Sequence, residues 1–238
     1  MRGEIAKLRY LPTPRWTAAV VAATVVIVGA VLLIVTPEDP TKYVTIPNSA
    51  VGLVGALAST VFGVWMATLE FSSGTLQRTL TAEPDRTRVL SSKLALALAV
   101  ALVGGVAIAA AAGGLANLAA NHAGVEIDRG DLAAGLFGQI PEWVANVAIG
   151  FGFGLLSRSL GGGIAAALAF LLALDGLLTF IPGAADYSFG QLSQDLSNGI
   201  TGTGETVNDL AAAIVGVLVW CLVIVVPGWV RFVRGDLK

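Results

Sequence analysis

Six apolar segments, each about long enough to cross a lipid bilayer, account for most of this 238-residue chain. An α-helix needs roughly 20 apolar residues to span about 30 Å of hydrocarbon. Because these segments leave no room for a soluble catalytic domain, we predict an all-α integral membrane protein with one transmembrane domain over residues 1–238. The predicted spans are residues 16–36, 49–69, 94–120, 141–160, 161–181 and 210–230.

The charged residues are few, and they are sorted by side. Only 13% of the residues are charged, about half the usual share in a soluble domain. If both termini lie in the cytoplasm, twelve of the fourteen basic residues are cytoplasmic, and Lys42 and Arg129 lie outside. The positive-inside rule therefore predicts that both ends of the chain are cytoplasmic. Most acidic residues fall on the outer side, so the net charge of −2 belongs to that side and nucleic acid is disfavoured as a partner.

Residues 1–15 predict a short helix that lies on the cytoplasmic membrane surface. Ile5, Leu8 and Leu11 recur at helical spacing among basic residues. This pattern is typical of an amphipathic interfacial helix. The alternative is a disordered basic tail.

Three segments between the spans carry expectations of their own. The three prolines of residues 37–48 predict a short extended loop. Residues 132–140 are apolar but too few to cross the bilayer, which favours a re-entrant or interfacial helix. Residues 182–209 form an extracellular segment rich in Gly, Ser, Thr and acids. A loop of that length is typically either functional or disordered.

Small residues are frequent in the third and fourth spans. They let transmembrane helices approach closely, because packing drives the association of helices in lipid. Gly150, Gly152 and Gly154 occupy alternate positions of the fourth span, so they do not form one helical stripe.

Two acidic residues stand within or beside the predicted spans. Asp175 has apolar neighbours on both sides, and an ionised carboxylate there normally faces the bundle interior, a cavity or a partner. It is either a pathway or intersubunit contact, or a protonated or hydrogen-bonded carboxyl packed against small residues. Glu142 follows Pro141 at a helix start, where an acid is favourable. Capping therefore explains Glu142, with a pathway role as the alternative.

The residue types that common catalytic and cofactor sites need are scarce. The chain has one histidine, His122, and one cysteine, Cys221. A metal cluster built on histidine and an intrachain disulfide are therefore excluded. The glycines at 161–163 lack the Lys-Ser/Thr of a nucleotide-binding P-loop. We expect no cofactor and no enzymatic activity, so active transport would need an ion gradient or a separate ATPase.

The longest polar stretch on the predicted cytoplasmic side runs over residues 70–93. Leu76 and Leu80 are four residues apart and would form one apolar ridge on a short helix. The loop offers no evident burial partner for this ridge, which suggests a groove on another protein.

This stretch carries an acid at the end of the second span, then a Gly-Thr pair, a leucine, a proline, an arginine and a lysine; these are Glu70, Gly74, Thr75, Leu80, Pro84, Arg86 and Lys93. The pattern resembles the coupling region of the ABC-2 family of ATP-binding-cassette permeases, also called type V exporters. The architecture is similar over the whole chain, from the basic amphipathic N-terminal segment through six spans to an extended outer segment before the last. That outer segment is polar here, where the family often has a compact apolar re-entrant hairpin.

The resemblance implies a permease half in the plasma membrane. Two such subunits, identical or paralogous, would form the substrate pathway. Two cytoplasmic ATPase subunits would dock on the coupling region, which includes Leu76 as well as the matching residues. The family exports drugs, peptides, lipids and polysaccharides. Aromatic residues make up only 7% of this chain, which favours a lipophilic drug, a peptide or a lipid over a polysaccharide.

Two other classes of protein stay open. One is a secondary transporter or channel without an ATPase, in which Asp175 would be the coupling or selectivity site. The other is a non-transporting membrane protein, such as an assembly or sensor subunit.

Overall fold

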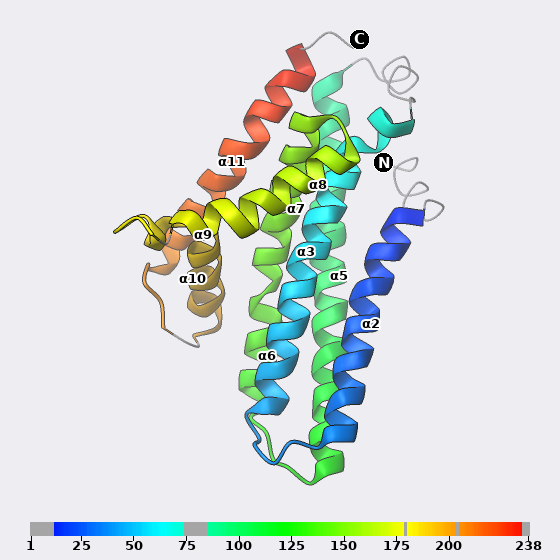
Figure 1. Cartoon of the computed structure of the whole chain (residues 1–238), viewed down its shortest axis with the longest axis vertical. Coiled ribbons are helices and arrows are strands. Elements are labelled where there is room, and N and C mark those ends of the chain that lie inside the picture. The colour runs from blue at the N-terminus through cyan, green and yellow to red at the C-terminus, as the bar shows by residue number, and fades with distance from the viewer. Residues whose placement is uncertain (1–11, 74–84, 179, 203–204, 235–238) are drawn as a thin grey trace.

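The computed structural model describes residues 12–73, 85–178, 180–202 and 205–234. All regular elements within these ranges are helices, which confirms the predicted all-α class (Figure 1). Six helical segments are long and apolar enough to cross a membrane. The elements are α2 (Pro12–Val35), α3 (Lys42–Ser73), α5 (Arg86–Ala123), α6 (Arg129–Gly138), α7 (Ile140–Ser157), α8 (Leu160–Ala169), η1 (Phe170–Leu174), α9 (Asp175–Leu178), η2 (Ala185–Tyr187), α10 (Phe189–Thr201) and α11 (Leu210–Arg234).

The start of α2 and the end of α11 lie toward the same end of the bundle (Figure 1). This arrangement agrees with an even number of membrane crossings, and we refer to this end as the predicted cytoplasmic end. The interfacial helix expected at 1–15 falls mainly on residues 1–11, which lie outside the described residues. In the described part, α2 covers Pro12–Val35.

The helix α3 starts earlier than the prolines of residues 37–48 suggest. The Asp39 carboxylate accepts hydrogen bonds from the Thr41 N–H (2.9 Å) and the Thr41 hydroxyl (2.7 Å). These bonds close a turn from which α3 begins at Lys42, with Pro47 inside the helix. The expected extended loop is therefore wrong beyond its first few residues.

The apolar residues 132–140 belong to the fourth candidate span and pack within the bundle. The helix α6 leads into α7 with an interruption at Gln139, and residues 129–157 form one candidate span. Leu132 and Leu136 are buried in a cluster with side chains of α3 and α5. The expectation of a re-entrant or surface helix is corrected because this packing buries the apolar face within the bundle.

The helix α7 is the centre of the bundle. It packs against α3, α5, α8, α10 and α11. Val147 and Phe151 lie on one side of this helix and Ile149 lies on the opposite side, and all three are fully buried. A helix that is apolar on every side requires neighbours on every side.

The glycines of α7 allow close contact with two different helices, α3 and α11. A Cβ atom at Gly150 would lie 2.1 Å from the backbone oxygen of Thr60 in α3. A Cβ atom at Gly152 would instead lie 2.8 Å from Ile224 in α11. Gly154 faces α3 again, one turn after Gly150. The prediction that these glycines do not form one stripe is confirmed, because alternate positions face different helices.

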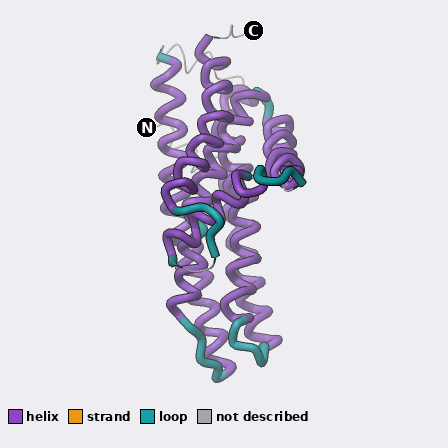
Figure 2. The backbone as a smooth tube through the Cα atoms, turned by 90° about the vertical axis from the view of Figure 1, so that its left-hand side faces the viewer, coloured by secondary structure: helices purple, strands orange, loops and turns teal. Residues whose placement is uncertain are grey.

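The fifth candidate span is held at one end only. Figures 1 and 2 show α8 and α9 at a steep angle to α3, α5 and α7. The ring of Phe170, at the start of the π-helical turn η1, packs against Phe189 (6.0 Å between centroids) and Trp220 (5.3 Å). Beyond this contact the chain leaves the bundle, and Leu177 and Phe180 are exposed.

The segment 182–209, which the sequence predicts to be extracellular, is built around a buried carboxylate. Asp195 of α10 has no exposed surface within the protein. Its oxygens accept hydrogen bonds from the Gln191 side chain (3.0 Å), the Val207 N–H (3.1 Å), and the N–H (3.0 Å) and amide side chain (2.9 Å) of Asn208. Burial raises the pKa of the Asp195 carboxyl, but these donors outweigh it and hold the pKa below its usual 3.8. The polar residues of this segment thus include the donors that fold residues 207 and 208 back onto Asp195 of α10.

We predict that Asp195→Ala opens this segment. The backbone N–H groups of Val207 and Asn208 lose their charged acceptor, and a hydrogen bond to a charged group contributes about 1.5–3 kcal/mol. Hydrogen exchange of the amides of Val207 and Asn208 should accelerate strongly in the variant. Asp186→Ala is the matched control, because Asn208 is bound by the backbone oxygen of Asp186 and not by its carboxylate.

The same carboxylate gives this segment a pH dependence. The pKa of the Asp195 carboxyl is lower in the folded protein than in the unfolded chain. The ionised carboxylate therefore stabilises the segment fully above pH 3.8, and this stabilisation is lost as the pH falls through the lowered pKa. The amides should therefore stay protected from neutral pH down to that point. Equal exchange in Asp195→Ala and the wild type would contradict the assignment.

Candidate functional site

The predicted coupling region lies at the predicted cytoplasmic end, between α3 and α5. Residues 74–84 lie outside the described residues, so Gly74, Thr75, Leu76, Leu80 and Pro84 remain sequence predictions. The backbone at position 70 belongs to α3. The structure describes this region again from Asp85 onward. The Asp85 carboxylate caps α5 by accepting hydrogen bonds from the N–H groups of Thr87 (3.0 Å) and Arg88 (3.1 Å).

Arg86 joins the coupling region to the end of α11. Its guanidinium donates to the backbone oxygens of Phe232 (3.3 Å) and Val233 (3.2 Å). The last carbonyls of a helix lack intrahelical partners and carry the negative end of the helix dipole. The arginine therefore places a positive charge at the described end of α11 and fixes the start of α5 to it.

A second pair of arginines joins α7 to α11 at the same end. Arg231 donates to the backbone oxygen of Leu156, and Arg158 donates to the backbone oxygen of Arg231 (3.2 Å). Arg158 is the C-cap residue of α7 in the left-handed conformation, with φ of 56°. Sequence reasoning assigned these arginines only to the charge asymmetry. Their role as helix caps depends on which helix ends meet in the fold.

Lys93 lies on α5 near this end and is almost completely buried, with 2% of its surface exposed. Leu90 and Ala97, about one turn before and after it on α5, belong to the apolar cluster of α3, α5, α7 and α11. A lysine that matches the family pattern is thus a buried residue of the inner bundle and not a surface charge.

We predict that Arg86→Ala loosens the end of α11. Amide hydrogen exchange over residues 229–234 should rise, because two terminal carbonyls lose their donor. Arg129→Ala removes the same charge at the opposite end of the bundle, where Arg129 begins α6, and should leave this exchange unchanged. Unchanged protection in Arg86→Ala would mean that the arginine does not hold α11.

The two predicted pathway residues lie on separate elements. Glu142 is half-buried in the first turn of α7 and has no recorded hydrogen bond or ion pair within the described residues. Asp175 is the first residue of α9, directly after η1. π-Helical turns occur frequently at functional sites. The structure does not bring the two residues into one site. No three His, Cys, Asp or Glu side chains of the described chain cluster as a metal site would require.

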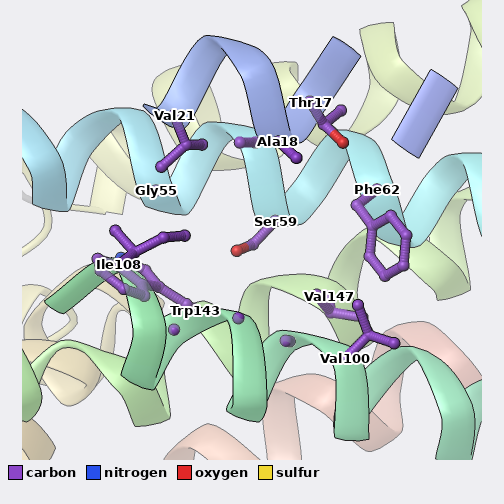
Figure 3. Close-up of a pocket in the computed structure, with 14 residues that line it drawn as sticks. Thr17, Ala18, Val21, Gly55, Ser59, Phe62, Val100, Ile108, Trp143 and Val147 are labelled. Carbon is purple, nitrogen blue, oxygen red and sulfur yellow. The ribbon is translucent and has the colours of Figure 1, made fainter. Parts of the chain in front are cut away.

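A cavity of about 220 Å³ lies among α2, α3, α5 and α7 (Figure 3). Its wall is mainly apolar and rich in small side chains, and the hydroxyl of Ser59 points into it. Sequence reasoning missed this cavity, because a void depends on how three or four helices meet. The lining residues are Thr17, Ala18, Val21, Gly55, Ala58, Ser59, Phe62, Val100, Ala101, Gly104, Gly105, Ile108, Trp143 and Val147.

Comparison of the chain with protein-family models, with curated proteins and with solved structures finds no match in any of the three. The resemblance to ABC-2 permeases therefore depends on the coupling-region residues and on the order of the spans.

Proposed function

We propose that this chain is the transmembrane permease subunit of an ATP-binding-cassette exporter of the ABC-2 type, in the plasma membrane. The observation that carries the proposal is the residue pattern from Glu70 to Lys93 at the junction of α3 and α5. The chain has no P-loop of its own, so separate cytoplasmic ATPase subunits would supply the energy.

The caps at the predicted cytoplasmic end support a coupling role. A force applied to the region between α3 and α5 would act on α5 directly, and on α11 through Arg86. It would then reach α7 through Arg158 and Arg231. An ATPase that binds one arrangement of these helix ends more tightly would shift the bundle toward that arrangement.

A second permease subunit, identical or paralogous, would complete the pathway. The far end of the fifth span supports this expectation, because Leu177, Phe180 and Ile181 are exposed large apolar side chains beyond the last contact with the bundle. The proposed substrate is a lipophilic drug, a peptide or a lipid, and the proposed direction is export.

Purification from native membranes tests the proposal. A tagged chain should copurify with a protein that carries a P-loop, identified by mass spectrometry. Proteoliposomes that contain both proteins should move substrate only with ATP. Transport by the purified chain alone, driven by an ion gradient, would contradict the exporter assignment.

The predicted orientation is tested by cysteine labelling in a Cys221→Ser background. A membrane-impermeant maleimide added outside should react with cysteines at the exposed positions Thr41 and Glu205. It should not react at Thr87 or Ser159, which are also exposed but lie at the other end of the bundle. Labelling of position 87 from outside would reverse the topology.

An ion-coupled carrier or channel is the second candidate function. The π-helical turn directly before Asp175 is the observation in its favour. In that case Asp175→Leu should abolish transport and leave expression intact. Asp175→Asn should make transport independent of the ion gradient. A non-transporting assembly or sensor subunit would give no substrate movement in any of these assays.

A further inference from the structure

The cavity among α2, α3, α5 and α7 exists because α2 departs from α5 along its length. Farther from the predicted cytoplasmic end the two helices touch, and a Cβ atom at Gly29 would lie 3.1 Å from Leu115. At the cavity, a Cβ atom at Gly104 would meet nothing within 4 Å. The resulting space of about 220 Å³ is larger than an engineered apolar cavity of about 150 Å³ that binds benzene.

The chemistry of the wall selects an apolar occupant. None of the lining residues is charged, and the indole N–H of Trp143 already donates to the backbone oxygen of Gly52 (3.3 Å). The side-chain hydroxyls of Thr17 and Ser59 are the other polar groups of the wall. A buried water needs two to four polar partners, and a charged headgroup would have no counter-charge in this wall.

The shape of the cavity favours a chain over a compact ring. Along α5 the wall extends from Val100 to Ile108, which is roughly 12 Å at the rise of an α-helix. Phe62 and Val100 lie toward one end of the space, and Ile108 and Trp143 lie toward the other (Figure 3). The long direction of the space therefore follows the helices, as lipid chains do in a bilayer.

The opening faces lipid. Ala18 of α2, which lines the cavity, is exposed, and the outward face of α5, turned away from the cavity, exposes Leu102 and Val103 to the same surroundings. In a six-span membrane protein, exposed apolar side chains of this kind contact acyl chains. We propose that the cavity holds one acyl chain of a membrane lipid, which enters between α2 and α5. This occupant is independent of whether the protein is an exporter.

Quenching by brominated lipid tests the proposal with Trp143 as the reporter. The other four tryptophans, Trp16, Trp65, Trp220 and Trp229, are replaced by phenylalanine, and the protein is reconstituted in phosphatidylcholine with dibrominated acyl chains. Trp143 is buried within the protein, so strong quenching requires a chain inside the cavity. Gly104→Leu fills the cavity and should reduce the quenching several-fold.

The matched control is Ala107→Leu, which adds the same side chain to an exposed position of the same helix and should leave the quenching unchanged. Equal quenching in the Gly104→Leu and Ala107→Leu variants would overturn the proposal. So would quenching of Trp143 by soluble bromobenzene but not by brominated lipid, because the occupant would then be a compact molecule.

A second measurement avoids the tryptophan substitutions. Native mass spectrometry of the otherwise unchanged protein should detect a phospholipid that survives delipidation in the wild type and in Ala107→Leu. The lipid should be absent from Gly104→Leu. Retention of the lipid in Gly104→Leu would contradict the assignment of the cavity as its site.

Discussion

Gly150→Ala is expected to force α3 and α7 apart and to lower the melting temperature of the solubilised protein strongly. The new Cβ atom would lie 2.1 Å from the backbone oxygen of Thr60. A backbone atom cannot turn aside as a side chain can, so the two helices must separate. Overpacking of a core typically costs about 1–3 kcal/mol. We expect a value at the upper end, because separation also breaks the buried contact of Thr60 with Asn146 (3.3 Å).

Gly114→Ala is the control for this prediction. It adds the same methyl group to a membrane-length helix, at a position where a Cβ atom meets nothing within 4 Å. Its melting temperature should match or exceed the wild-type value, since alanine favours a helix over glycine. Gly63→Ala, on the facing side of α3, should repeat the Gly150→Ala result, because its Cβ atom would lie 2.2 Å from the backbone oxygen of Val147. If both variants melt like Gly114→Ala, the close contact of α3 with α7 is wrong.

If the proposed function is right, the double substitution Leu76→Asp and Leu80→Asp should abolish association with the proposed ATPase and leave the chain folded in the membrane. The predicted ridge would present two carboxylates to an apolar groove, and burying an unpaired charge is prohibitive. Association should be measured by the amount of P-loop protein that copurifies with the tagged chain. The melting temperature and the yield from membranes report on folding.

The control for the coupling ridge is Gln77→Asp with Thr81→Asp. These positions have the same spacing and receive the same charge, but they lie beside the predicted ridge. The control should retain the ATPase. Loss of the ATPase in both pairs would indicate a general effect of charge, and retention in both would mean that the ATPase binds elsewhere.

The parts of the fold that depend on the length of apolar sequence could be predicted. Six apolar runs predict six long helices because no other backbone form satisfies its hydrogen bonds within one segment in lipid. The alternate spacing of Gly150, Gly152 and Gly154 also excluded a single glycine stripe. What the spacing could not give is which helix each glycine meets, since that depends on the order of helices around α7.

The parts that depend on contacts between distant segments could not be predicted. The carboxylate of Asp195 is a buried acceptor because residues 207 and 208 return to α10. From the sequence it is one acid among several in a polar loop. In the same way, Arg86 and Arg231 each contribute one positive charge to the asymmetry between the two sides. Their contacts with the ends of α11 and α7 depend on which helix ends meet in the fold. The early start of α3 has a local cause, the Asp39 turn, which the prolines of residues 37–48 obscured.

The central place of α7 has a consequence for biogenesis. When synthesis has just completed α5, the chain already contains α3 with Gly63 on the face that packs against α7. The helix α7, which covers this face in the folded protein, has not yet been made. At synthesis rates of about 5–20 residues per second, the ribosome needs roughly 2–7 s to extend the chain from Ala123 to Ser157. During this interval Gly63 and its neighbours face lipid or the insertion machinery. Chaperoning of the first three spans, and quality control of chains that stall there, would therefore act before α7 enters the membrane.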